Sequence, residues 1–244
     1  MVNEIFPESL TGEELDQFLL QGWYRMGQRL FTVDYIFIER WIRVFWLRFK
    51  MSDFSFSKKQ KELMSKVERF NVRILPLEIS DEQEALYAIY YKSIDFEASP
   101  TASDFLFGRD LFTEDQPNIF NSRMVEVRDG KKLISVGVFD MGQNSLAGIL
   151  NFYHPDYKKY SLGRYMILKK MEFALKSGLE WYYPGYVGYN FQKFEYKLFP
   201  GVETAEFLEP LAMQWLPYSN ESIEFYTLSQ NALFVPLDKK EDFG

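Results

Sequence analysis

The clearest pattern of apolar and polar positions lies between residues 123 and 183 of this chain. Short runs rich in β-branched and aromatic residues alternate with turn-forming pairs, and one longer run has helical spacing. The pattern predicts strands over 124–127, 133–139, 146–153 and 181–183, and a helix over 161–176. Asp129-Gly130 and Asn144-Ser145 make the turns, Ser161 caps the helix and Gly178 closes it. This order predicts an α+β fold in which flanking helices cover a mixed sheet.

Three helices are predicted in the N-terminal half, each by a capping box ahead of an apolar face. They span 10–22, 58–70 and 80–92, with the boxes Thr11 and Glu14, Ser57 and Gln60, and Ser80 and Gln83. Extended segments are expected at 24–31, 41–50 and 72–77, the second of them buried. Residues 93–121 are irregular, as is typical of a segment that covers a site. We expect a small N-terminal α/β subregion over 1–75 and the main domain over 76–244.

The composition excludes several kinds of chemistry. The 244 residues include no Cys and one His, which excludes a thiolate zinc site and a Cys nucleophile and disfavours a Ser-His-Asp triad. We therefore expect no metal and no cofactor. The first residues lack a signal-peptide pattern and no apolar run is long enough to cross a bilayer, which predicts a cytoplasmic protein with no membrane partner.

The charge gives a mixed indication. A net charge of −7 weakly opposes nucleic acid as the main ligand, and DNA is not expected as a partner. Basic side chains nevertheless gather at Lys58, Lys59, Lys61, Lys66, Arg69 and Arg73, and again at Lys158, Lys159 and Arg164. Such groups are either a solvated face or a patch for an anionic ligand.

Candidate site residues follow from the ends of the predicted elements. Ser161 and Gly163 begin a helix, where free N–H groups and the positive end of the dipole favour an anion or a developing oxyanion, and Arg164 adds charge. Asp140 ends a strand, where a carboxylate either orients an amine or caps a turn. The alternative for Ser161, Gly163 and Arg164 is an ordinary capped helix with solvated lysines beside it.

A dense aromatic stretch follows the last predicted strand, between 181 and 199. These rings line a pocket or belong to the core; Tyr186 ends a strand and is the candidate for the pocket. If 193–197 is extended, Lys193 and Lys197 share one side and Tyr196 takes the other. We expect a cleft among Tyr153, Gly163 and Tyr186, with Lys193 or Lys197 at its rim, because these strand and helix ends converge.

The motifs together resemble a known family. They are Phe152-Tyr153-His154-Pro155-Asp156-Tyr157, Ser161-Leu162-Gly163, Ile167-Leu168, Gly178-Leu179, Tyr182-Tyr183, Gly185-Tyr186, Lys193 and Tyr196-Lys197. This set resembles the C-terminal region of the aminoacyl-tRNA–protein transferases, which include arginyl transferases and bacterial leucyl transferases. Upstream, Gly22 to Gly27 is similar to the family's short G-W-R-R-S-G element. The resemblance covers roughly residues 15–215.

The resemblance implies a GNAT-like acyltransferase fold and transfer of arginine or leucine from aminoacyl-tRNA to the α-amine of a protein, with an acidic N-terminus as the expected acceptor. It implies that Asp140 and Tyr153 orient groups or handle protons and that Ser161 and Gly163 offer N–H donors. The same resemblance implies substrate contacts for Tyr186, Lys193, Tyr196 and Lys197.

This chain also departs from the family pattern. It lacks the N-terminal Cys cluster, and Lys92 to Phe96 replace an Arg-His pair. Ala147, Leu150 and Pro184 replace residues of the site strands. Two further classes therefore stay open: a GNAT-type acyltransferase that uses acyl-CoA or another small donor, and an inactive binding protein that keeps the fold.

Overall fold

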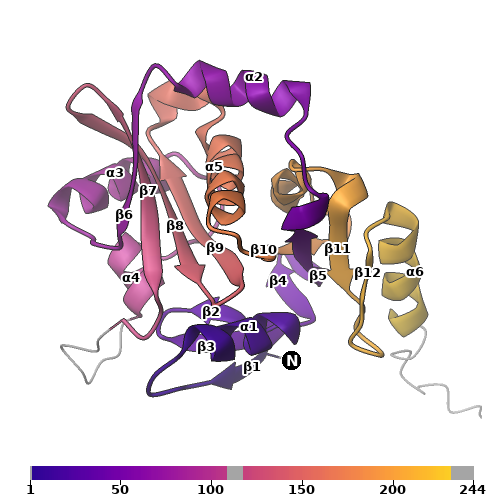
Figure 1. Cartoon of the computed structure of the whole chain (residues 1–244). Coiled ribbons are helices and arrows are strands. Elements are labelled where there is room, and N and C mark those ends of the chain that lie inside the picture. Colours follow the sequence, from indigo (N-terminus) through magenta and orange to yellow (C-terminus); the bar gives the residue numbers. More distant parts are fainter. Residues whose placement is uncertain (1, 109–117, 232–244) are drawn as a thin grey trace, which may run out of the picture.

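The computed structural model describes residues 2–108 and 118–231. Its centre is a large mixed sheet with helices on both faces, and a small three-stranded sheet lies at one end (Figure 1). The α+β class with a mixed sheet and flanking helices is confirmed. The strands are β1 (Val2–Ile5), β2 (Tyr24–Met26), β3 (Arg29–Val33), β4 (Tyr35–Ile38), β5 (Arg40–Lys50), β6 (Asn71–Pro76), β7 (Ser122–Asp129), β8 (Lys132–Met141), β9 (Ser145–Tyr153), β10 (Trp181–Gly188), β11 (Ala205–Leu208) and β12 (Trp215–Pro217). The helices are α1 (Gly12–Leu20), α2 (Lys58–Val67), α3 (Asp81–Tyr91), α4 (Ala102–Phe107), α5 (Leu162–Lys176) and α6 (Asn220–Asn231), with short 3₁₀ helices η1 (Met51–Asp53), η2 (Pro155–Tyr160), η3 (Gln192–Leu198) and η4 (Val202–Thr204).

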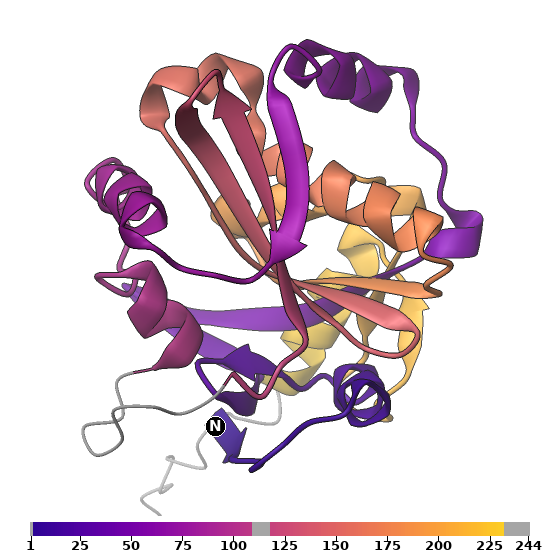
Figure 2. The same ribbon diagram turned by 60° about the vertical axis from the view of Figure 1, so that its left-hand side comes forward.

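The large sheet consists of two halves that meet at one short pairing. Its strand order is β12-β11-β5-β10-β9-β8-β7-β6, with β4 paired to β5. The parallel pairing of β9 with β10 covers only 145–147 and 181–183. Beyond Tyr183, β10 continues along β5 alone, so the two halves diverge (Figure 2).

Helices cover both faces of the β6–β9 half. On one face α5 packs with α2 beside it, and its buried Leu162, Met166 and Met171 contact the core that includes Val125 and Phe139. On the opposite face α3 and α4 lie together (Figures 1 and 2). This arrangement leaves the end of β9 between a helix on each face, which positions the site.

The N-terminal residues form a small sheet, β1-β3-β2, and helix α1. Leu15, Leu19 and Tyr24 pack against Trp46 of β5 and Tyr183 of β10. β5 is itself a central strand of the large sheet, between β10 and β11. The predicted boundary at 75/76 stays a prediction.

Most local predictions are confirmed by the structure. All three capping boxes form, with Glu14, Gln60 and Gln83 each bonded back to its cap. β5 matches the expected buried strand, and Gly178 closes α5 with φ +68°. In the irregular region 93–121 the structure has α4, and 109–117 lie outside the described residues.

Two local predictions are wrong. Ser161 makes no side-chain capping bond; it is left-handed at φ 50°, because η2 leads directly into α5 and one residue must reverse the chain. The extended interpretation of 193–197 is also wrong, because these residues lie within η3. Lys193 and Lys197 are therefore not neighbours on one side of a strand.

Candidate functional site

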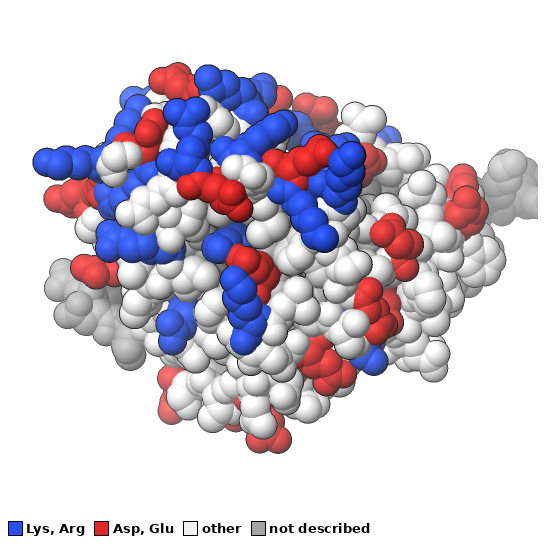
Figure 3. Space-filling model, turned by 45° about the horizontal axis from the view of Figure 1, so that its top comes forward, with Lys and Arg blue, Asp and Glu red and all other residues white. Residues whose placement is uncertain are grey.

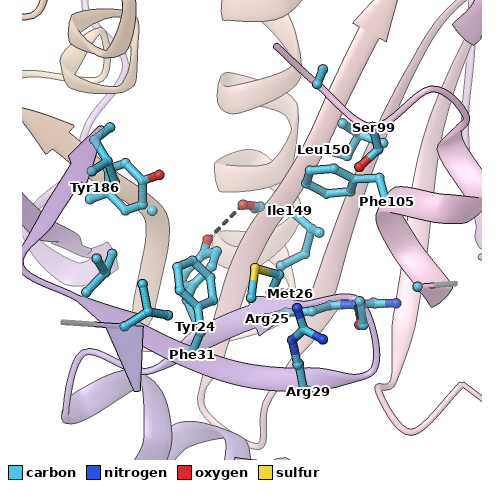
Figure 4. A pocket seen from close by; sticks show the side chains of 18 of the residues that line it. Tyr24, Arg25, Met26, Arg29, Phe31, Ser99, Phe105, Ile149, Leu150 and Tyr186 are labelled. Atoms are coloured by element: carbon cyan, nitrogen blue, oxygen red, sulfur yellow. Dashed lines mark hydrogen bonds between the residues drawn. The ribbon is translucent and has the colours of Figure 1, made fainter. Parts of the chain in front are cut away.

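A cleft of about 1480 Å³ opens where the two halves of the sheet diverge. Tyr186 of β10 stands on one wall, and Phe105 and Leu150 stand on the other (Figure 4). Tyr24 and Met26 of β2 form the base between them (Figure 4). The cleft therefore collects residues from the small N-terminal sheet, both halves of the large sheet, α3, α4 and η3.

Irregular backbone borders this cleft on both strands. In β10 the register shifts between Tyr182 and Gly185, and Pro184 lies in that bulge, where its missing N–H costs no ladder bond. Gly185 has φ +97°, and a Cβ there would come within 3.3 Å of the Lys197 ammonium. In β9, Ile149 has no partner in the β8 ladder. The regular strand ladder is therefore interrupted on both sides of the cleft.

Tyr24 fills the point where the strands separate. Its hydroxyl donates to the Gly148 carbonyl oxygen at 2.7 Å (Figure 4) and lies 2.8 Å from the Tyr183 carbonyl oxygen. Its ring stacks on Trp46 at 5.3 Å between centroids. Tyr24 thus joins β9 to β10 where the two strands separate.

Lys197 places a cation in the cleft wall. Its ammonium donates to the Tyr186 carbonyl at 2.8 Å and lies 4.7 Å from the ring centroids of both Tyr186 and Phe194. Burial lowers the pKa of Lys197 to about 7. No carboxylate among the described residues pairs with it. Its charge is therefore available to an anionic ligand.

Lys193, predicted at the same rim, has another partner. Its ammonium lies 3.0 Å from Asp95 Oδ1 on the exposed surface and 5.5 Å from the Phe96 ring centroid. Phe96 itself lines the cleft, but Lys193 does not. The structure therefore separates the two lysines that the sequence grouped.

Three tyrosines gather beside α5. Tyr90 and Tyr196 line the cleft, and Tyr153 packs its ring 5.6 Å from that of Tyr90. Burial raises the pKa of Tyr90, and it raises the pKa of Tyr196 to about 12, with the neighbouring Tyr153 adding to both shifts. The hydroxyls of Tyr90 and Tyr196 therefore stay protonated at neutral pH.

The start of α5 lies next to this group. A Cβ at Gly163 would lie 3.5 Å from the Tyr153 ring, so the helix start and the end of β9 are in contact. Ser161 is exposed, and the Arg164 guanidinium lies over the Phe199 ring at 5.1 Å. Tyr153, Ser161, Gly163 and Arg164 do not line the cleft itself but stand behind its wall.

Asp140 lies away from the cleft. It is fully buried within β8, and its Oδ1 accepts from Arg25 at 2.8 Å and from the Ser122 hydroxyl. Burial raises the pKa of the Asp140 carboxyl, against the opposing effect of Arg25. Arg25 lines the base of the cleft and also bonds the Gly27 carbonyl at 2.9 Å. Asp140 therefore reaches the cleft only through Arg25.

Three residues at or behind the cleft were missed by sequence reasoning. Tyr24 and Arg25 lie inside the Gly22 to Gly27 motif, so that motif was the available signal. Lys170 is fully buried in α5 and donates to Val138 O at 2.6 Å and to Asn151 Oδ1 at 2.9 Å. Burial lowers its pKa to about 7. A lysine on the apolar face of a predicted helix was its only sequence signal.

Within residues 2–108 and 118–231, no group of three His, Asp or Glu side chains is placed to hold a metal ion. No helix in the same residues is long and apolar enough to cross a membrane.

Comparison with known proteins shows which family and which relatives the chain is similar to. Residues 82–200 match the family described as arginine-tRNA-protein transferase, C terminus. The chain is 27% identical to an aspartate/glutamate leucyltransferase of Helicobacter hepaticus over 172 residues, covering 69% of this chain and 68% of that protein. A protein of the same name from Stutzerimonas stutzeri is 33% identical over 144 residues, 58% and 59% of the two chains. That of Campylobacter jejuni is 24% identical and covers 79% of each.

Solved structures are more distant. FemX aligns with a TM-score of 0.44 at 11% identity, over 93% of this chain and 74% of that one. L-PGS from Bacillus licheniformis aligns at 0.41 and 10% identity, over 71% and 49%. The family match therefore rests on sequence. It defines an enzyme of the aminoacyltransferase class. Within that class, the chain is similar to the aminoacyl-tRNA–protein transferase family, in agreement with the resemblance of its motifs.

Proposed function

We propose that this protein transfers leucine from leucyl-tRNA to the α-amine of proteins that begin with Asp or Glu. The curated relatives named above support both the donor and the acidic acceptor. The inner walls of the cleft support leucine over arginine, since Met26, Phe105, Ile149 and Leu150 offer an apolar surface. Burying a leucine side chain against such a surface is favourable by about 1.5–3 kcal/mol.

Lys197 is the observation that carries the proposal. An acidic N-terminal residue needs one cation beside the reacting amine, and a leucyl donor needs none. Lys197 offers that cation, free of carboxylate partners among the described residues and held by the Tyr186 carbonyl. A charge-assisted contact of this kind contributes about 1.5–3 kcal/mol.

The chemistry needs no redox partner. The neutral α-amine attacks the ester carbonyl carbon, a C–N bond forms and the C–O bond to the ribose breaks. The proton lost by the amine ends on the ribose oxygen, which leaves as a hydroxyl group. Tyr186 and Tyr196, whose pKa values burial raises, remain protonated and donate to the developing oxyanion. Arg25, held by Asp140, fixes the base of the cleft, and Tyr153 supports Tyr90.

The rim of the cleft suits the 3′ end of a tRNA. Phe37 and Trp41 stand at this rim, 64% and 70% exposed, with ring centroids 5.4 Å apart. Exposed rings of this kind stack nucleobases, each at about 1–3 kcal/mol.

The test is a transfer assay. Purified protein is incubated with radiolabelled leucyl-tRNA or arginyl-tRNA and with peptides that differ only in an N-terminal Asp, Glu, Asn or Ala. We expect label from leucyl-tRNA in the Asp and Glu peptides. Transfer of arginine instead, or equal labelling of all four peptides, would overturn the assignment, and acetylation from acetyl-CoA in a parallel reaction would favour the small-donor class.

A further inference from the structure

A basic surface runs across one end of the molecule, away from the base of the cleft. We define it by exposed cations of α2, the following turn, the β7–β8 turn, η2 and the first turn of α5. These are Lys58, Lys59, Lys61, Lys66, Arg69, Lys131, Lys132, Lys158, Lys159 and Arg164. Figure 3 shows Lys and Arg side chains concentrated over the upper part of this face, although the whole chain carries −7.

Aromatic rings join the separate elements of this surface. Phe70 after α2 packs on Tyr157 and Tyr160 of η2, with ring centroids 5.9 and 4.9 Å apart. Arg69 donates to the Tyr160 hydroxyl at 3.3 Å, and Lys132 lies 5.5 Å from the Tyr157 ring. The cations are therefore held in one continuous arrangement.

The surface reaches the wall of the cleft at α2. Gln60, buried on α2, donates to the carbonyls of Phe199 at 2.9 Å and Pro200 at 2.6 Å. These two residues directly follow η3, which carries Tyr196 and Lys197 into the cleft. Arg164 lies over the same Phe199 ring. The end of η3 thus connects the basic surface to the wall of the cleft.

The cations of α2 carry unneutralised charge. None of its lysines forms an ion pair with another described residue. The acidic side chains within the surface are fewer, namely Glu62, Glu68, Asp129 and Asp156. Two of them are engaged locally, because Asp129 accepts from Tyr157 and Asp156 lies beside His154. The local field is therefore positive on an acidic protein.

We infer that this basic surface binds the phosphate backbone of the tRNA arm whose 3′ end enters the cleft. The inference rests on the proposed function and adds where the donor docks. The ten residues of α2 give a helix of about 15 Å, long enough to follow several phosphates. Contacts with about 3–4 phosphates predict a log–log salt slope of about −2 to −4.

RNA fits this surface better than an anionic membrane does. A helix that lies on a bilayer needs exposed apolar side chains beside its charges. On α2, Val67 is fully buried and Leu63 and Met64 are turned partly inward. No large apolar side chain of α2 or η2 is exposed.

Paired charge changes on α2 test the inference. Binding of uncharged tRNA is measured by fluorescence anisotropy for wild type, for Lys59→Glu with Lys66→Glu, and for Glu62→Lys with Glu68→Lys. We expect the first pair to weaken binding about tenfold or more at low salt and to flatten the salt slope by about one unit for each phosphate that is no longer neutralised. We expect the second pair, with Glu62 on the same helix and Glu68 directly after it, to strengthen binding and steepen the slope. Lys176→Glu, at the far end of α5 and outside the basic surface, is the control and should leave both tRNA affinity and salt slope unchanged.

The outcomes separate the inference from the proposed function. In transfer assays the first pair raises the KM for aminoacyl-tRNA and leaves the KM for the peptide unchanged. If wild type transfers leucine but neither pair alters tRNA affinity or slope, the inference is wrong and the function stands. If wild type binds tRNA with these charge effects but transfers nothing, the function is wrong and the surface stands. Binding to vesicles of anionic lipid, with the same charge effects and without tRNA binding, would overturn the inference in favour of a membrane.

Discussion

Replacing Lys197 by Met removes a positive charge from the cleft wall with little change in shape. The ammonium group has one hydrogen bond, to the Tyr186 carbonyl at 2.8 Å, and two ring contacts at 4.7 Å. If the Lys197 ammonium binds the acidic side chain of the acceptor, losing it costs about 1.5–3 kcal/mol of transition-state binding. We therefore expect kcat/KM for an Asp peptide to fall about 10- to 150-fold, since each 1.36 kcal/mol is a factor of about ten.

The ratio of kcat/KM for an Asp peptide to that for its Asn counterpart isolates this interaction. Both peptides carry the same α-amine, whose ionisation cancels in the ratio. Lys197 has a pKa of about 7 in the free protein, so it is charged below pH 7 and loses its charge above it. We expect the wild-type ratio to be high at about pH 6, to fall about tenfold per pH unit above pH 7, and to be flat and near one in the variant.

Lys193→Met is the matched control, because Lys193 belongs to the same short helix but pairs with Asp95 at the surface. It should change neither ratio nor pH profile, and Lys197→Arg should keep part of the discrimination. Initial rates from about pH 6 to 9, at saturating leucyl-tRNA, measure all four proteins. An Asp/Asn ratio in Lys197→Met that equals the wild-type ratio would refute the assigned role.

Three further predictions concern stability. Asp140→Asn leaves the Arg25 charge unpaired in the interior and should lower the free energy of unfolding, measured in urea, by about 3–5 kcal/mol. The surface change Lys176→Ala is the control and should lower it by less than about 1 kcal/mol. A decrease for Asp140→Asn as small as that of the control would contradict the buried ion pair. Tyr24→Phe leaves two carbonyls without their donor and should cost about 1–3 kcal/mol in the same assay, and an unchanged midpoint would argue against the bridge between β9 and β10. Lys170 has a pKa of about 7 in the folded protein, below its value in the unfolded chain, so above pH 7 the unfolded state binds more protons and the free energy of unfolding rises with pH. Lys170→Met should remove about 1.4 kcal/mol per pH unit from that rise between about pH 7.5 and 9.5. An unaltered slope of stability against pH would exclude the lowered pKa.

The sequence by itself determined many of the elements and their order, although β4, β11, β12, α4 and α6 were not predicted. Capping boxes at Thr11, Ser57 and Ser80 start helices because the bonds they make are local, and the turn at Gly130 joins two strands for the same reason. The alternation of residues over 123–183 predicted a mixed sheet with a helix between its last two strands. The family motifs were also readable, since they are sets of nearby residues.

Only the tertiary structure decided which of the candidate residues meet. Lys193 and Lys197 are four positions apart, yet one pairs with Asp95 on the surface and the other enters the cleft, because η3 is helical and turns them in different directions. Asp140 was placed at a free strand end by local pattern and is instead held by Arg25, 115 positions earlier. Ion pairs and cavities of this kind depend on how distant segments pack. Local hydrogen bonding and periodicity carry no information about that packing, so the cleft became visible only when β2, β9, β10 and η3 were brought together.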